Sequence, residues 1–237
     1  MEGFTYHNIF DTKGIEYIFI IIFFAVLIPF WIILHRKSRK LALVSEAFSI
    51  SPDDLRIPQG VFFGRNHTWL YLLKNGKARI GLDDLLMHTT GLVNISFTAE
   101  PGTRVEKGDL IAELNHKGNR LQILSPLSGE IRKANDSLNK HPEQMNNQPF
   151  SEGWIFEIKP SHWLRDTRAC MLGEKASQWI NDELIRFKDF VMSSTLNRDP
   201  ANSRVVLQDG GELKDHTLQK LPAGMWKDFQ NNFLTLS

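Results

Sequence analysis

The side chains that could carry out chemistry are few in this sequence and lie far apart. Cys170 is the only cysteine, so it cannot form an internal disulfide, a Cys-x-x-Cys pair or a thiolate zinc site. The eight histidines are dispersed, with no pair at metal-ligand spacing on a predicted helix. The adjacent carboxylates Asp83 and Asp84 begin a short helical pattern, where they complement the helix dipole. We therefore expect no metal site, no catalytic residues and no enzymatic activity.

The charge balance excludes a further class of partner. The chain of 237 residues has 28 Lys and Arg against 27 Asp and Glu, a formal net charge of +1, and shows no basic stripe for nucleic acid. Hydrophobic residues make up 42% of the chain, which is enough for one or two domains with a core. No small-molecule substrate is evident either. The expected partners are therefore proteins and a lipid bilayer.

The bilayer is expected because of an uncharged segment near the N-terminus. From Tyr17 to Leu34 most residues are Ile, Phe and Leu, over about the minimum length that spans a bilayer core of ~30 Å at ~1.5 Å per residue. We predict a single transmembrane helix over residues 15–35. Basic residues follow it at positions 36, 37, 39 and 40. The positive-inside rule then places residues 1–14 outside the cell membrane and the main domain in the cytoplasm.

The elements after the predicted helix indicate a mainly β protein with added α-helix. Residues 36–60 are polar and predict a basic flank and a tether. Residues 61–162 contain short alternating runs between turn residues, and Asn75-Gly76 between two such runs is a strong hairpin signal. A helical stripe of apolar residues predicts an amphipathic C-terminal helix within residues 163–195, followed by a tail over residues 196–237. This pattern is typical of a small sandwich or barrel-like fold.

The β region resembles the H protein of the glycine cleavage system, a lipoyl-domain protein, over about Phe63 to Ser161. The resemblance is carried by the order and spacing of five pieces: Asn66–Leu70, Ile80–Asp84, Pro101–Asp109, Leu124–Ile131 and Asn135–Trp154. It implies a barrel-sandwich hybrid, the lipoyl-type fold. His67 beside Trp69 then falls on a structural position of that fold, and we interpret it as a structural histidine.

The resemblance also implies a lysine at the tip of a β-hairpin, where the family carries a lipoyl group. Counting forward from Gly108 and back from Leu124 by the family's spacing leads both times to Gly118, so glycine stands at the lysine position. Lys117, one residue earlier, is the only candidate for lipoyl attachment. A shift of one residue along a strand turns a side chain to the opposite face, although turns are less strict. We expect Gly118 to supply a positive φ angle and Lys117 to be a solvated turn residue.

Two functions from different classes remain open. The first is a non-catalytic subunit or adaptor without a lipoyl group, held at the cytoplasmic face of the membrane in a complex, for which a redox or electron-transfer complex is the expected partner. The second is a lipoyl carrier with the arm on Lys117, serving a membrane-associated decarboxylase or dithiol redox enzyme. A modified Lys117 would distinguish the second function from the first.

Overall fold

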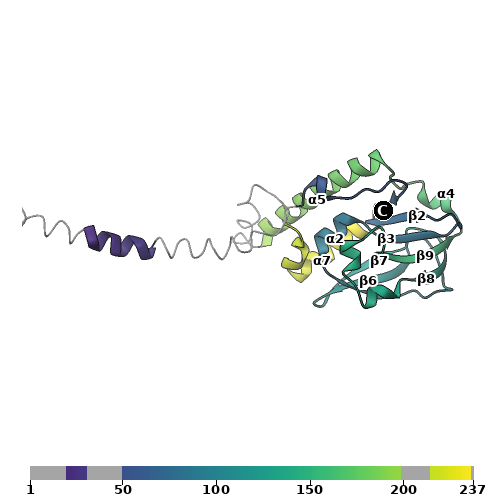
Figure 1. Cartoon of the computed structure of the whole chain (residues 1–237), viewed down its shortest axis with the longest axis horizontal. Coiled ribbons are helices and arrows are strands. Elements are labelled where there is room, and N and C mark those ends of the chain that lie inside the picture. Colours follow the sequence, from purple (N-terminus) through teal and green to yellow (C-terminus); the bar gives the residue numbers. More distant parts are fainter. Residues whose placement is uncertain (1–19, 31–49, 199–213, 236–237) are drawn as a thin grey trace, which may run out of the picture. The chain divides into compact units, whose positions relative to one another are not determined.

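The computed structural model describes residues 20–30, 50–198 and 214–235. The chain divides into two compact units, Met1–Ala47 and Phe48–Ser237. In the first unit, residues 20–30 form a helix. The second unit contains two β-sheets with helices packed around them (Figure 1).

The helix of the first unit corrects the prediction of a membrane anchor. Within the described ranges, no helix has both the length and the apolar character needed to cross a membrane. The predicted transmembrane helix over residues 15–35, and the cell-membrane location derived from it, are therefore wrong on this finding. The remainder of that span, residues 1–14 and the basic flank lie outside the described residues.

The second unit is β-rich, as the alternating runs predict. All strand pairs are antiparallel. The larger sheet has the order β1 (Phe62–Phe63), β2 (Thr68–Leu72), β3 (Ala78–Leu82), β9 (Trp154–Pro160), β8 (Gly129–Ala134), β5 (Arg104–Val105). The smaller sheet has the order β4 (Asn94–Phe97), β6 (Leu110–His116), β7 (Asn119–Leu124). Between β2 and β3, Gly76 has a φ of 76°, which completes the turn that Asn75-Gly76 predicts.

Both sheets contribute one face to a common core. Along β7, Leu121 and Ile123 are buried, whereas Arg120 and Gln122 are exposed, because successive side chains on a strand point to opposite faces. The buried residues of β7 belong to the same hydrophobic cluster as Ile80 of β3 and other buried residues of the larger sheet. The core therefore lies between the sheets. A second, smaller hydrophobic cluster contains Phe63, Trp69 and Trp154 of the larger sheet together with Val61 and Ala176.

Helices cover the ends and sides of the sheets. The α-helices are α2 (Asp84–Thr90), α3 (Gln144–Asn147), α4 (Trp163–Thr167), α5 (Glu174–Arg198) and α7 (Ala223–Phe229). Three 3₁₀-helices are η1 (Pro52–Asp54), η2 (Asp136–Asn139) and η3 (Thr217–Lys220), and η4 (Gln230–Leu234) is a π-helix. The predicted stripe on α5 is buried at Ala176, Ile180, Leu184, Phe187 and Val191.

Residues 214–235, here named the C-terminal segment, pack between α5 and the smaller sheet (Figure 1). Phe187 of α5 lies 5.6 Å from Phe229 and 5.9 Å from Phe233, measured between ring centroids. Met225, Trp226 and Phe229 of α7 are almost completely buried. The C-terminal segment is therefore part of the core of the second unit.

Gly129 of β8 is placed where no side chain fits. A Cβ atom there would lie 2.4 Å from the backbone oxygen of Lys159 and 2.8 Å from Cγ2 of Ile158. We expect Gly129→Ala to lower the free energy of unfolding by about 1–3 kcal/mol, measured by urea denaturation, because the β8–β9 pair must separate. Gly102→Ala is the control, since a Cβ atom there meets nothing within 4 Å and only its φ of 92° opposes alanine. Equal losses in the two variants would contradict this account.

Candidate functional site

The hairpin between β6 and β7 carries the residues that sequence reasoning singled out. His116 and Asn119 are the last paired residues, so Lys117 and Gly118 form a two-residue loop. Their φ angles are 48° and 89°. Positive φ at both central residues is typical of the type I′ turn, whose twist matches that of the strands. A Cβ atom on Gly118 would meet nothing within 4 Å, so the glycine is required by its backbone angle and not by lack of space.

The three basic residues of the hairpin do not share one environment. Lys117 is exposed at the tip. The side chain of Arg120 is 70% exposed, with Nη1 3.8 Å from Oε2 of Glu113 on the neighbouring strand. His116 points to the side of the hairpin, where its Nδ1 lies 3.1 Å from the backbone oxygen of Leu92. Only Lys117 and Arg120 are thus available to a partner at the tip.

The C-terminal segment covers one flank of this hairpin. The rings of His116 and Trp226 stack with a centroid distance of 6.0 Å and an angle of 3° between their planes. The Gln122 backbone N–H donates to the side-chain oxygen of Gln230 at 2.6 Å, and the Gln230 amide donates back to the Gln122 oxygen at 3.2 Å. The side-chain amide of Gln230 thereby pairs with both backbone hydrogen-bonding groups of Gln122 on β7. Sequence reasoning did not find these contacts, which join residues more than 100 positions apart.

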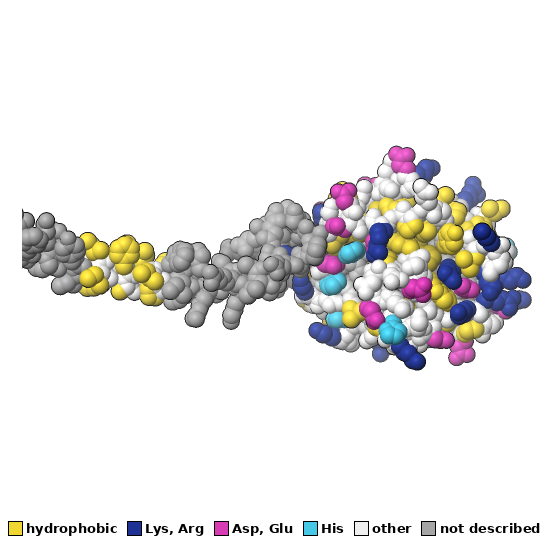
Figure 2. Space-filling view, viewed as in Figure 1, with side chains coloured by type: hydrophobic (Ala, Val, Ile, Leu, Met, Phe, Trp, Pro, Cys, Tyr) yellow, Lys and Arg dark blue, Asp and Glu magenta, His cyan; other side chains and the backbone are white. Residues whose placement is uncertain are grey.

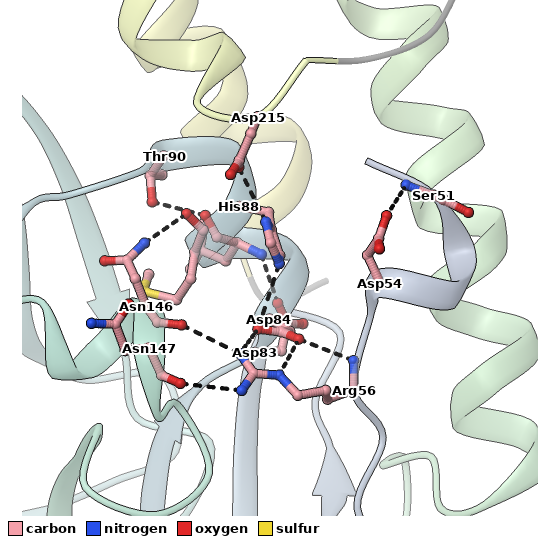
Figure 3. Close-up of polar contacts among 12 residues, drawn as sticks. Ser51, Asp54, Arg56, Asp83, Asp84, His88, Thr90, Asn146, Asn147 and Asp215 are labelled. Carbon is pink, nitrogen blue, oxygen red and sulfur yellow. Dashed lines mark hydrogen bonds and ion pairs between the residues drawn. The ribbon is translucent and has the colours of Figure 1, made fainter. Parts of the chain in front are cut away.

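A second group of polar residues lies at α2 (Figure 3). Asp83 accepts from the Leu86 N–H at 2.8 Å and so caps the helix, as the pattern predicts. Asp84 instead accepts three bonds from Arg56, at 3.0 Å from the backbone N–H, 2.9 Å from Nε and 2.8 Å from Nη2. These hydrogen bonds raise the pKa of Arg56 above its ordinary value, against the effect of partial burial. Asp84 therefore fixes the chain before β1 onto α2.

His88 of α2 extends this group to the C-terminal segment. Its Nδ1 lies 3.1 Å from Oδ1 of Asp215, and its Nε2 lies 3.9 Å from Oδ1 of Asp84 (Figure 3). A cavity of about 330 Å³ opens beside it, lined by Met87, Leu92, Glu143 and Asn146 among others. The side-chain amide of Asn146 donates to the Met87 backbone oxygen at 3.0 Å. On this wall of the cavity, the Asn146 amide and the Met87 backbone therefore already bind each other.

A third group surrounds the fully buried His67. Its Nδ1 donates to Oδ2 of Asp83 at 2.8 Å, and its ring lies 5.3 Å from Trp179 of α5 and 6.2 Å from Phe233. Burial alone would lower the pKa of His67, but the charge and hydrogen bond of Asp83, together with the charge of Glu183, raise it above the ordinary value. The carboxylates around the buried His67 thus favour its protonated form.

The described residues offer no metal centre and no reactive thiolate. In residues 20–30, 50–198 and 214–235, no group of three His, Cys, Asp or Glu side chains is arranged to hold a metal ion. Burial raises the pKa of the Cys170 thiol, which makes it a poor nucleophile at neutral pH. On the face shown in Figure 2, Lys and Arg side chains are interspersed with Asp and Glu, without one continuous basic stripe.

Two antiparallel sheets around one core, with an exposed two-residue hairpin, define a domain of the lipoyl type. The family model described as "Glycine cleavage H-protein" matches residues 61–183, and the chain belongs to this family. The predicted resemblance to the H protein is thereby confirmed. Residues 1–60 and 184–237, including the C-terminal segment, lie outside the matched part.

Individual relatives cover the same part of the chain. A "Probable glycine cleavage system H protein" of Pyrococcus horikoshii is 26% identical over 131 residues, which are 55% of this chain and 97% of that protein. The "Glycine cleavage system H protein" of Thermus thermophilus is 35% identical over 104 residues, 44% of this chain and 80% of that protein. A crystal structure of the H protein from Mycobacterium marinum is 20% identical, with a TM-score of 0.45, and covers 54% of this chain and 98% of that one.

The family's lipoyl group does not fit the position where the resemblance implies it. Glycine has no amine to acylate, and the φ of 89° at Gly118 is one that a lysine would adopt only with strain. Lys117 has an amine and is exposed, one residue earlier in the same loop. The only lysine in the loop is therefore displaced from the position that the family spacing marks.

Proposed function

We propose that this chain is a non-enzymatic member of the H-protein family that carries no lipoyl group and acts as a subunit or adaptor in a protein complex. The observation that carries the proposal is Gly118, at the family's lysine position, with a backbone angle suited to glycine. The partner class we propose, a redox or electron-transfer complex, rests on the family's chemistry alone.

The surroundings of the hairpin support a binding role over a carrier role. A lipoyl arm must swing between active sites, which requires free space around the hairpin from which it extends. Here Trp226 stacks on His116 and Gln230 binds the backbone of Gln122, so one flank of the hairpin is occupied by the chain itself. The exposed tip instead presents Lys117 and Arg120, which suit a fixed contact with an acidic surface.

The alternative function, a lipoyl carrier with the arm on Lys117, is favoured by the exposure of this side chain at the tip. A turn leaves more freedom of side-chain direction than a strand does, so the amine could reach a lipoate ligase. The two functions differ in one covalent bond, the lipoyl amide on Lys117, so an experiment that detects this bond distinguishes them.

We expect the wild-type chain to remain unmodified when it is produced with lipoate and a lipoate ligase, as measured by intact mass. Lys117→Arg is the matched control, because it keeps the charge and removes the amine that could be acylated. Gly118→Lys places an amine at the family position and is expected to gain one lipoyl group. The H protein of Thermus thermophilus serves as the positive control.

A lipoyl increment on the wild type that disappears in Lys117→Arg would overturn the proposal and establish the carrier. If Gly118→Lys also stays unmodified while the control H protein is modified, the whole tip has lost recognition by the ligase, which agrees with the proposal. When the chain is purified from its native source in a separate experiment, the adaptor is expected to copurify with its partner at a constant ratio.

A further inference from the structure

His67 joins the domain to helix α5 through two carboxylates. Its Nδ1 binds Asp83 at 2.8 Å, and its Nε2 lies 4.0 Å from Oε2 of Glu183 on α5. Within the described residues, neither this Nε2 nor this Oε2 has a hydrogen-bond partner, although Arg186 Nε lies 3.1 Å from the same Oε2. A protonated His67 directs an N–H at Glu183. When His67 is neutral, the buried carboxylates of Asp83 and Glu183 lose the positive charge that lies between them.

His88 joins the domain to the C-terminal segment in the same manner. It lies between Asp215, 3.1 Å away, and Asp84, 3.9 Å away (Figure 3). Its backbone oxygen also accepts from the His216 N–H at 2.7 Å. Because Arg56 already pairs with Asp84, Asp215 is the carboxylate that depends most on the charge of His88. Of the two neighbouring aspartates, Asp83 thus contacts His67 and Asp84 lies near His88.

Both histidines keep their protons more firmly in the folded chain than in the unfolded one. The hydrogen bond to Asp215 raises the pKa of His88, against partial burial. Burial lowers the pKa of His67, but Asp83 and Glu183 outweigh it and the pKa is raised. A raised histidine pKa stabilises the fold fully below the unfolded value of ~6.5, and this stabilisation is lost as the pH rises through the folded value.

We propose that these two histidine bridges make the docking of α5 and the C-terminal segment proton-dependent: charged imidazoles hold both against the domain, and loss of the protons loosens them. Arg56, Arg186 and Glu143 are the other charged groups around the two bridges. His216 Nε2 lies 3.4 Å from Asp215 and is replaced separately in the test. Loosening uncovers the flank of the hairpin on which Trp226 lies.

The test is hydrogen exchange of residues 214–235 in the full chain between pH 6 and 9, corrected for the intrinsic pH dependence of exchange. We expect protection to fall from pH 6 to pH 9, by a factor of ten for each unit by which the folded histidine pKa exceeds the unfolded one. Asp215→Asn should lower protection at pH 6 and flatten the pH dependence. Glu130→Gln, which removes a carboxylate 2.9 Å from Arg132 and far from both bridges in the sheet, should leave the curve unchanged.

Imidazole NMR titration of the wild type supplies a measurement that does not depend on any variant. Midpoints of His67 and His88 above ~6.5 are expected. Midpoints at or below that value for both histidines, or protection that does not vary with pH, would overturn the proposal. The proposal would also be overturned if the pH dependence of protection changes in His216→Gln but not in Asp215→Asn.

Discussion

Replacement of Trp226 by alanine is expected to lower the free energy of unfolding by about 3–5 kcal/mol. Trp226 is 1% exposed, stacks on His116 and lies in α7 between buried Met225 and Phe229. Removal of the indole leaves a cavity at the contact between the C-terminal segment and the hairpin. Urea unfolding followed by far-UV circular dichroism measures the loss without relying on tryptophan emission.

The control for Trp226→Ala is Ile185→Ala on the outer side of α5. Ile185 is 57% exposed, so its replacement should change the free energy of unfolding by no more than about 0.5 kcal/mol. A loss below about 1 kcal/mol for Trp226→Ala would mean that the C-terminal segment is not docked in solution. The hairpin flank would then be open, and the argument against a swinging arm would lose its support.

Asp83→Asn is expected to destabilise the fold by about 3–5 kcal/mol at pH 6, because it removes the carboxylate that lies 2.8 Å from Nδ1 of the buried His67. Asparagine keeps an oxygen that can cap the Leu86 N–H, so the loss reports on the charge of Asp83 and on its hydrogen bond with His67 and not on helix capping. The loss should shrink as the pH rises, since the raised pKa of His67 means that the imidazole becomes neutral only above its ordinary range. Unfolding curves at pH 6 and pH 9 measure both effects.

Asp53→Asn is the matched control, since Asp53 is exposed in η1 and its replacement should be nearly neutral at both pH values. If Asp83→Asn costs the same at pH 6 and pH 9, the charge of His67 has no part in the effect. The histidine would then act as a neutral hydrogen-bond donor, and the proton-dependent docking of α5 would be contradicted at this bridge.

Local patterns predicted the β-rich part of the chain well. The alternation along β7, the turn at Asn75-Gly76 and the capping of α2 by Asp83 depend on neighbours within a few residues. The position of Gly118 in the hairpin turn followed from spacing, because the loop between two strands is set by residue count. The prediction of a membrane span, made from the apolar composition of residues 15–35, was wrong, since no helix among the described residues is long and apolar enough to cross a membrane.

The sequence by itself determined the strands, the turns and the hairpin with Lys117 and Gly118 at its tip, since these depend on side-chain period and backbone angles. The tertiary structure alone decided that Trp226 and Gln230 cover the hairpin flank and that His67 and His88 meet carboxylates. His88 and Asp215 are 127 positions apart, and no local pattern couples them. Their meeting depends on how buried surfaces of remote segments fit together, which in turn decides which histidine pKa values are raised.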